Sequence, residues 1–307
     1  MFTETRAVFF HCVSPVHMGS GTALGIVDNP IQRERHSHFP VFAGSGIKGA
    51  LRHHVLNRAV WDKPKLEAIF GPESERGSDQ LHAGAISFTD AQLVCFPARS
   101  AKNAFAYITC PLALATAQRL LRLSGLPCAW TIPNVKENEA VCASESLGKP
   151  SVALELFDFP TQVSPAAQRI AEDLAGFMPK GEEWTFFRNK LKTDLLVLHD
   201  TDFTYFARNA TSVEPHVSIE NDTGAADGGK LFYTENLPPE SILLGLLLAS
   251  KTRVRKSKEG GPAIQLDAGQ VAESATTAAE GLLQIGGDAT TGRGQVVLTF
   301  PASGAQQ

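Results

Sequence analysis

The chain has 307 residues, with 28 Lys and Arg against 32 Asp and Glu, which gives a formal net charge of -4. A chain of this length buries roughly three-quarters of its unfolded surface, so it needs neither disulfides nor a metal ion to fold. The acidic balance argues against a protein that coats nucleic acid through overall positive charge.

The cysteines are scattered, with no C-x-x-C pair and no nearby paired histidines, which excludes zinc-finger spacing. They are Cys12, Cys95, Cys110, Cys128 and Cys142. An odd number of cysteines without a signal-peptide pattern is typical of reduced thiols. The longest apolar run, residues 242–249, is too short to span a bilayer. We therefore expect a soluble cytoplasmic protein with no membrane partner.

The first elements along the chain are short strands. Residues 7–13 form an apolar run rich in β-branched and aromatic side chains, which predicts a buried strand. Residues 24–27 predict a second short strand, which ends at the turn sequence Asp28-Asn29-Pro30.

A helix is expected next, over residues 44–59, with Ser45 as its N-cap. Lys48 and Arg52 are four residues apart on one face of this helix, so both can point at one ligand. The polar, glycine-containing stretch from 61 to 80 indicates a surface insertion, placed within residues 60–84.

Strands and helices then alternate, which favours an α+β fold. Residues 85–89 predict a strand, whereas 111–123 and 165–176 predict amphipathic helices. Extended pieces around 203–207 and 230–234 flank a turn-rich polar segment, the pattern of a protruding hairpin over 205–234.

After the hairpin, residues 242–248 predict a core strand. A loop with five basic residues follows at 250–262. Such a run is most simply a solvated loop, so composition alone leaves nucleic-acid binding open.

Two glycine-rich segments raise the question of phosphate binding. Residues 44–49 satisfy G-x-G-x-x-G, but the preceding strand is short, and Gly71-Pro72 interrupts the chain where a second strand should emerge. A dinucleotide site is therefore not expected. A helix N-terminus with Lys48 nearby could still bind a phosphate, although the glycines could equally serve a tight turn.

The second glycine-rich segment, residues 285–294, leads into a strand at 295–300. It is not a nucleotide-hydrolysing phosphate loop, because Arg293 stands where that motif requires Lys. A hairpin turn explains it equally well.

Asp28 and His17 are the candidate chemical groups. A carboxylate between turn residues is exposed, so Asp28 could bind a divalent cation, orient a nucleophile or move a proton. The alternative is an aspartate that only hydrogen-bonds its own turn. His17 could act as a general base or be an ordinary surface residue.

Taken in order, four motifs resemble one family. They are Pro-Val-His-Met-Gly-Ser-Gly at 15–21, Ile-Val-Asp-Asn-Pro-Ile-Gln-Arg-Glu at 26–34, Pro-Val-Phe-Ala-Gly-Ser-Gly-Ile-Lys-Gly-Ala-Leu-Arg at 40–52 and Gly-Gly-Asp-Ala-Thr-Thr-Gly-Arg-Gly at 286–294. Together they resemble the RAMP superfamily of CRISPR proteins, and residues 27–34 are similar to the filament-forming backbone subunit of the type III-B Cmr complex. Residues 90–200 contain no motif that matches.

The resemblance implies a single RAMP domain over residues 1–307, with a ferredoxin-like core related to the RRM. It implies a lid at 60–84 and a thumb hairpin at 205–234 that displaces a base pair of the guide–target duplex. Its partners would be guide RNA, single-stranded target RNA, other Cmr subunits and further copies of the chain, stacked head to tail. The implied activity is divalent-metal-dependent endoribonuclease cleavage of target RNA at regular intervals, with Mg²⁺ or Mn²⁺ as cofactor.

Site residues carry over by position. Asp28 matches the family's cleavage residue and would hold the metal or orient the attacking hydroxyl, while His17, Tyr233 and Glu235 match positions near the cut. The residues expected to bind RNA are Gly44, Ser45, Lys48, Arg52, Arg33 and Arg293. His216 stands where the family has an arginine in the thumb strand.

Three other readings remain open. The subunit could bind guide RNA and assemble a filament without cutting. It could instead be a RAMP endonuclease that processes precursor guide RNA with His17 as general base. A nucleotide-dependent enzyme built on residues 44–49 would need dinucleotide affinity, which we do not expect.

Overall fold

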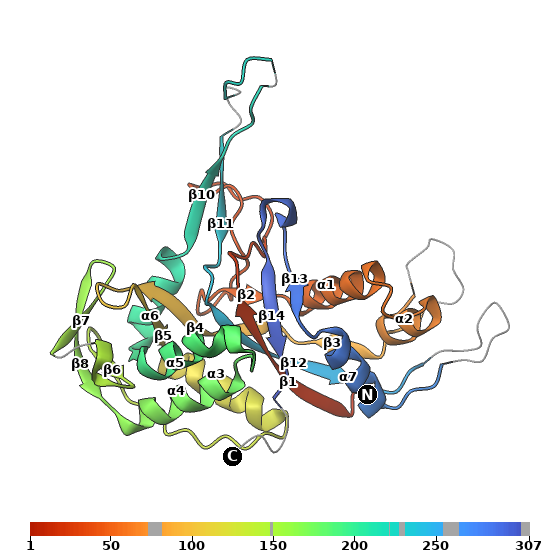
Figure 1. The fold of residues 1–307 in the computed structure, drawn as a ribbon, viewed down its shortest axis with the longest axis horizontal. Helices are drawn as coiled ribbons and strands as arrows, with labels where there is room; N and C mark the ends of the chain where they lie inside the picture. Colours follow the sequence, from red (N-terminus) through yellow and green to blue (C-terminus); the bar gives the residue numbers. More distant parts are fainter. Residues whose placement is uncertain (73–81, 148–149, 221, 227–230, 254–263, 302–307) are drawn as a thin grey trace.

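The computed structural model describes residues 1–72, 82–147, 150–220, 222–226, 231–253 and 264–301. Within these residues, one mixed sheet of 12 strands forms most of the structure, and a separate two-stranded hairpin projects from it (Figure 1). This mixed α/β fold agrees with the expected alternation of strands and helices. No helix in the described segments has the length and apolar character to cross a membrane.

Four strands form the centre of the sheet. β1 (Glu4–Cys12) pairs antiparallel with β12 (Ile242–Ala249) on one side and with β14 (Gln295–Thr299) on the other, and β12 pairs in turn with β4 (Ala91–Arg99). These positions confirm the strands predicted at 7–13, 242–248 and 295–300. All of β12 except Leu248 is buried, as its continuous apolar sequence requires.

The remaining strands extend the sheet on both sides, with parallel pairing only at β5·β9 and β6·β8 among the described strands. They are β13 (Leu282–Gln284), β2 (Val41–Phe42), β3 (Ile86–Phe88), β5 (Phe105–Thr109), β9 (Leu195–Leu198), β6 (Ala140–Cys142), β8 (Phe157–Val163) and β7 (Ser151–Leu154).

Helices cover both faces of the sheet, so the described residues form two hydrophobic cores, one on each face (Figure 1). Alternation along β1 directs Val8 and Phe10 into one core and Phe9 into the other. The first core also contains buried residues of α1 (Gly44–Asn57), α2 (Lys63–Phe70), α6 (Asp200–Asn209) and α7 (Ala268–Ala278). The second contains those of α3 (Pro111–Leu123), α4 (Pro165–Phe177) and α5 (Thr185–Thr193).

Three sequence predictions are wrong in detail. Residues 24–27 form an exposed loop, because Leu24 and Ile26 find no strand to pair with in the described structure. Residues 203–207 belong to α6, since Phe203 and Phe206 recur at helical spacing and both face the core. Ser45 lies exposed inside α1, and Ala43 is its N-cap residue.

The predicted surface insertion at 60–84 is only partly an insertion. Its first half contains α2, whose Leu66, Ile69 and Phe70 are buried in the first core. Asp62 caps this helix by accepting a hydrogen bond from the backbone N–H of Lys65, 3.0 Å away. Residues 73–81, and residues 254–263 of the predicted basic loop, lie outside the described residues.

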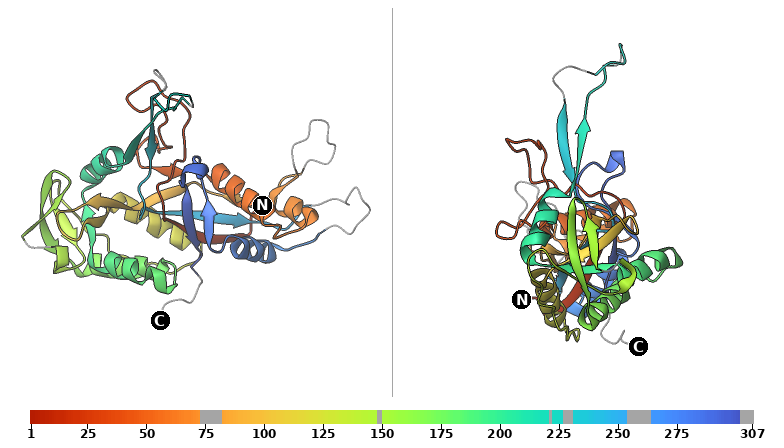
Figure 2. Two further views of the ribbon diagram at one scale, coloured as in Figure 1. Left: turned by 45° about the horizontal axis from the view of Figure 1, so that its top comes forward. Right: turned by 90° about the vertical axis from the view of Figure 1, so that its left-hand side faces the viewer.

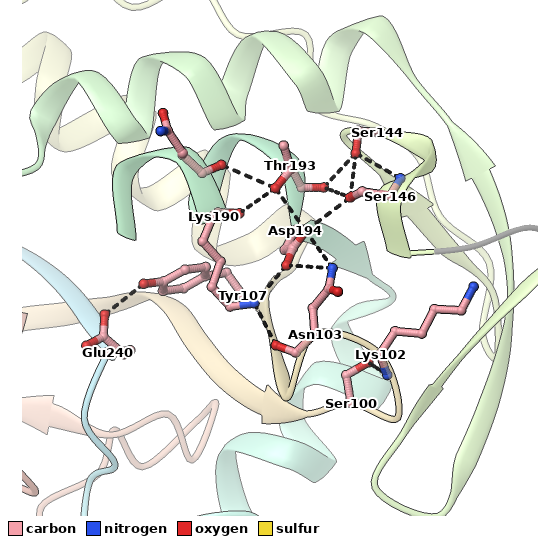
Figure 3. A network of polar contacts seen from close by, with 11 residues as sticks. Ser100, Lys102, Asn103, Tyr107, Ser144, Ser146, Lys190, Thr193, Asp194 and Glu240 are labelled. Atoms are coloured by element: carbon pink, nitrogen blue, oxygen red, sulfur yellow. Dashed lines mark hydrogen bonds and ion pairs between the residues drawn. The ribbon is translucent and has the colours of Figure 1, made fainter. Parts of the chain in front are cut away.

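A buried polar network holds together the region without family motifs (Figure 3). Lys190 Nζ lies 2.7 Å from Asp194 Oδ2 and donates to the Asn103 carbonyl at 2.9 Å. The same amine lies 4.4 Å from the centroid of the Phe105 ring. Because Asn103 lies in the turn between β4 and β5, the network fastens that turn to the end of α5. Its members satisfy one another, which is the condition for burying an ion pair.

Candidate functional site

The hairpin consists of β10 (Ser212–His216) and β11 (Phe232–Asn236), paired antiparallel. It projects from the body of the protein, and its root lies beside the N-terminal loop that follows β1 (Figure 2). Asn29 of this loop forms a parallel bridge with Thr234 of β11. Residues more than 200 positions apart in the sequence therefore meet at the root of the hairpin.

Asp28 is held there through the main chain of Tyr233. Its carboxylate Oδ2 accepts a hydrogen bond from Tyr233 N at 2.7 Å. The N–H groups of Asp28 and Asn29 both donate to the Tyr233 carbonyl, at 3.1 and 3.0 Å. The second carboxylate oxygen, Oδ1, accepts no hydrogen bond from the described part of the chain. Asp28 is thus fixed in place while one of its oxygens remains available.

Glu235 ties the same loop to β11 from inside. Its side chain is 8% exposed, and Oε1 accepts hydrogen bonds from Arg33 Nη2 at 2.5 Å and from Thr211 Oγ1 at 2.7 Å. Oε2 accepts from the backbone N–H of Ile31 at 3.0 Å. Both carboxylate oxygens are therefore engaged, so Glu235 serves here as a structural anchor.

Arg33 is the counter-ion of Glu235 and also holds the backbone on both sides. Its Nη1 donates to the carbonyls of His38 at 2.8 Å and Ala207 at 2.7 Å. With its side chain 18% exposed, Arg33 joins the loop to α6 and to the hairpin. Arg33 had been expected to bind RNA, but the structure places its guanidinium among protein acceptors. We call the set Arg33, Glu235 and Thr211 the latch.

His17 lies on the other side of Glu235, with Nδ1 2.7 Å from the Glu235 carbonyl oxygen. A carbonyl only accepts, so Nδ1 carries the hydrogen, and Nε2 has the lone pair when the ring is neutral. Nε2 lies 2.7 Å from where a Cβ on Gly19 would stand, so only a glycine leaves the ring this position. The geometry makes Nε2 a potential proton acceptor.

The C-terminal glycine loop, residues 285–294, contacts the backbone of His17. Gly287 N donates to the His17 carbonyl at 2.8 Å, and a Cβ on Gly286 would stand 2.3 Å from the same oxygen. In the same loop Arg293 pairs with Glu214 of β10. The loop thus contacts both His17 and the hairpin, which the sequence could not indicate.

A second group consists of the α1 residues that the sequence predicts to bind RNA. Gly44 is buried, donates its N–H to Asp90 Oδ1 at 2.8 Å, and lies so close to β3 that a Cβ would meet the Phe88 carbonyl. Its N–H is therefore not free for a phosphate. Ser45 is exposed. Burial, and then the charge of Arg52, lower the pKa of Lys48, so these two cations are near each other.

Arg52 donates to the Gly71 carbonyl at 2.6 Å, which ties α1 to the end of α2. Gly46 packs against Met18, the residue after His17. Helix α1 therefore lies against the loop that carries His17.

The site contains few groups that could hold a metal ion. In the described ranges no three His, Cys, Asp or Glu side chains gather in a metal-binding arrangement. Both oxygens of Glu235 are engaged, whereas Asp28 has an oxygen to offer a metal ion. A single carboxylate suits Mg²⁺, which commonly takes its other ligands from water and substrate phosphates.

The structure brings together the four residues that the sequence predicts near the cut, Asp28, His17, Tyr233 and Glu235. The sequence does not identify Thr211, Ile31 or Glu214 as part of the site. Their contributions depend on contacts between distant segments, for which no local pattern exists.

A family model described as the RAMP superfamily matches residues 9–297. The chain belongs to the RAMP superfamily. This RAMP protein is 33% identical over 297 residues to the CRISPR system Cmr endoribonuclease Cmr4 of Pyrococcus furiosus, a match that covers 95% of this chain and 94% of the relative. It is 25% identical over 268 residues to the CRISPR system CMR subunit Cmr4 of Saccharolobus solfataricus, covering 81% and 85% of the two chains.

Solved structures agree with this relationship. The crystal structure of oligomeric Cmr4 from Pyrococcus furiosus superposes with a TM-score of 0.71 at 26% identity, covering 98% of this RAMP protein and 99% of that chain. A chain of the type III-B Cmr-beta complex bound to cognate target RNA gives a TM-score of 0.71 at 20% identity, covering 97% and 98%. The matches confirm the predicted relationship to the Cmr backbone subunit and the predicted endoribonuclease class.

Proposed function

We propose that this chain is a repeating subunit that binds guide RNA, stacks head to tail with copies of itself and other Cmr subunits, and cleaves complementary target RNA at Asp28. The observation that carries the proposal is the position of Asp28 at the root of the projecting hairpin, hydrogen-bonded to β11. A hairpin that enters an RNA duplex would bring this carboxylate to the nucleotide that it displaces.

The core is proposed to be ferredoxin-like. The strand order β14-β1-β12-β4, with α1 between β1 and β4 and α7 between β12 and β14, supports this. Its relation to the RRM is consistent with RNA as the ligand.

In the proposed reaction the 2′-hydroxyl of the displaced nucleotide attacks the adjacent phosphate. The 2′-oxygen bonds to phosphorus, and the bond from phosphorus to the 5′-oxygen of the next nucleotide breaks, which leaves a cyclic phosphate. Asp28 orients the 2′-hydroxyl and accepts its proton, and solvent protonates the leaving oxygen. A displaced nucleotide can reach the in-line arrangement that a regular helix prevents.

A divalent ion, Mg²⁺ or Mn²⁺, would be held by Asp28 together with phosphate oxygens of the RNA. When bound, it would stabilise the negative charge that develops on the phosphate. The protein's own part is to hold Asp28 still, through Tyr233 and the latch.

The guide is proposed to lie along α1, where Ser45, Lys48 and Arg52 would contact its phosphates. Burial, and then the charge of Arg52, lower the pKa of Lys48, and a phosphate between the two cations would relieve their repulsion. Arg293 would reach the RNA only by leaving Glu214. On the hairpin, the His216 ring stacks on Phe232 with centroids 5.2 Å apart, which offers RNA a flat surface in place of an arginine.

Asp28→Asn in the assembled complex with guide RNA tests the proposal. The isosteric amide keeps the hydrogen bond from Tyr233 but loses the charge, so we expect target cleavage to fall at least a hundredfold with target binding unchanged. Asp222→Asn, an exposed carboxylate farther along the hairpin, is the matched control. Cleavage at the same spacing in the Asp28 variant would overturn the catalytic proposal. The chain would then be a subunit that binds guide RNA and assembles the complex without cutting.

His17 supports a second candidate function, processing of precursor guide RNA. The observation that favours it is the hydrogen bond that leaves Nε2 as the proton acceptor. This function predicts that the isolated chain cleaves hairpin precursors in the presence of a chelator. Target cleavage that stops on chelation and returns with Mg²⁺ or Mn²⁺ would instead support the first proposal.

A further inference from the structure

An open groove lies at the end of the sheet that carries α2 and α7. It encloses about 620 Å³, within the size range of small-molecule sites. Its walls are the segment from Val60 to Lys65 on one side and α7 on the other, with Arg6 of β1 between them. Figure 1 shows α2 and α7 at the opposite end of the sheet from β7 and β8, away from the hairpin. None of the residues assigned above to cleavage or guide binding lines this groove.

Trp61 provides an aromatic surface in the groove. Its ring is half-buried and packs on Phe70, with centroids 5.8 Å apart and an interplanar angle of 35°. Lys65 Nζ lies 5.1 Å from the Trp61 ring centroid. A cation over an indole ring is a favourable but modest contact at an exposed site, so a planar ligand can displace it.

The groove contains two cations, Arg6 and Lys65, and only Arg6 is paired with a carboxylate of the groove. Arg6 Nη1 is paired with Glu273 Oε2 at 2.9 Å, on the α7 wall. No carboxylate of the described residues forms an ion pair with Lys65, since Glu273 pairs with Arg6 and Asp62 caps the helix. The neighbouring Lys63 differs, since it pairs with Glu67 at 3.8 Å.

The α7 wall of the groove contains small and polar residues. Gly269, Ser274 and Thr277 are small residues that line the groove, and a Cβ on Gly269 would meet only Asp267 Oδ1 at 3.3 Å. The larger residues of this wall include the polar Gln270 and Glu273, so a flat ring against Trp61 would have hydroxyl and other polar groups near its edge to hydrogen-bond.

We infer that this groove binds one unpaired nucleotide of single-stranded RNA, with its base stacked on Trp61 and its phosphate paired with Lys65. Stacking on an aromatic side chain and pairing with a nearby cation are how proteins hold single strands without reading sequence. A nucleotide matches the groove in two ways. Its base is a planar ring that can stack on Trp61, and its phosphate is a negatively charged partner for Lys65. The site extends the proposed RNA binding to a surface remote from Asp28 and does not depend on cleavage.

Tryptophan fluorescence of the full chain, titrated with an eight-nucleotide oligouridylate, tests the inference. We expect saturable quenching that is lost in Trp61→Phe, in which Trp130 and Trp184 still report on any other site. Lys65→Ala should weaken the affinity for the oligouridylate about fivefold. It should also reduce the slope of log affinity against log salt by about 0.7, the value for one phosphate contact on a single strand.

Lys63→Ala is the matched control, because it removes a more exposed lysine of the same helix that does not line the groove, and it should leave both quantities unchanged. Thermal unfolding of each variant checks that the groove is intact. Asp28→Asn should quench like the unmodified chain, which separates this site from the cleavage proposal.

Quenching that persists in Trp61→Phe, or that is the same in Lys65→Ala and the unmodified chain, overturns the inference. So does Trp61 emission that changes with protein concentration but not with RNA, since the groove would then hold a neighbouring copy of the chain.

Discussion

The latch makes a quantitative prediction about how Asp28 is held. Glu235→Gln keeps the shape of the side chain but removes the charge opposite Arg33, in a pair whose side chains are 8% and 18% exposed. Removing one partner of a buried ion pair costs about 3–5 kcal/mol, because the remaining charge stays buried without compensation. Arg33 keeps two carbonyl acceptors and some solvent contact, so the cost should lie at the lower end of this range. We expect the free energy of unfolding, measured with urea at neutral pH, to fall by about 3 kcal/mol.

Two further variants separate the charge from the packing. Thr211→Val removes one hydrogen bond to the same carboxylate and should cost about 1.5 kcal/mol, as expected for a bond to a charged group. Arg33→Met combined with Glu235→Gln should cost less than the sum of the two single variants, by at least about 1 kcal/mol.

The functional consequence follows from the hydrogen bond between Glu235 and Ile31, three residues after Asp28. If this contact weakens, the carboxylate loses its fixed position, and small misplacements reduce catalysis strongly. We expect target cleavage in the assembled Glu235→Gln complex to fall about tenfold, with target binding unchanged. A stability loss below about 1 kcal/mol, or strictly additive single variants, would refute the latch.

Two other predictions concern the framework. Burial lowers the pKa of His11 to about 3, so the folded protein keeps this ring neutral, whereas the unfolded chain protonates it near pH 6.5. Stability should therefore fall as the pH drops from 7 to 5, by about 2 kcal/mol from this residue, and urea unfolding of His11→Gln should show a correspondingly flatter pH dependence. Gly286→Ala should lose at least about 2 kcal/mol and disturb His17, because φ is 82° and the new Cβ would meet a carbonyl oxygen. Gly292→Ala, with φ 81° and open space around it, should lose only about 1 kcal/mol, and equal losses in the two variants would contradict the proposed contact.

The elements that the sequence predicted correctly are those whose pattern is local. The helix at 111–123 has Pro at its first position and buried residues at helical spacing, and the observed α3 has the same bounds. Residues 242–248 form a continuous apolar run, which a doubly buried strand requires. In such segments propensity and burial favour the same structure.

The errors arose where propensity and tertiary contacts disagree. Residues 203–207 are rich in aromatic side chains, which favour a strand, but Phe203 must reach Phe39 and Phe206 must reach Phe159 in one core. Only a helix directs both inward. Residues 24–27 have the composition of a strand, yet no described neighbour offers an edge to pair with.

For the site, motifs identified individual residues but not their relations. Glu235 was named for its proximity to the cut, whereas the structure gives it three donors from distant segments. Arg33 was named for RNA, and the structure surrounds it with acceptors. A charged side chain looks the same in a sequence whether its partner is a ligand or another part of the chain.

The attachment of Asp28 to β11 uses the backbone N–H and C=O of Tyr233 and not its phenol ring. Any amino acid except proline supplies both groups. Position 233 can therefore change its side chain without releasing the aspartate, so the surface of the hairpin is free to adapt to a different RNA shape while the carboxylate stays where it is. Proline at 233 would remove the N–H that donates to Asp28 Oδ2 but keep the carbonyl that accepts from Asp28 and Asn29, so it should loosen the carboxylate without detaching the loop.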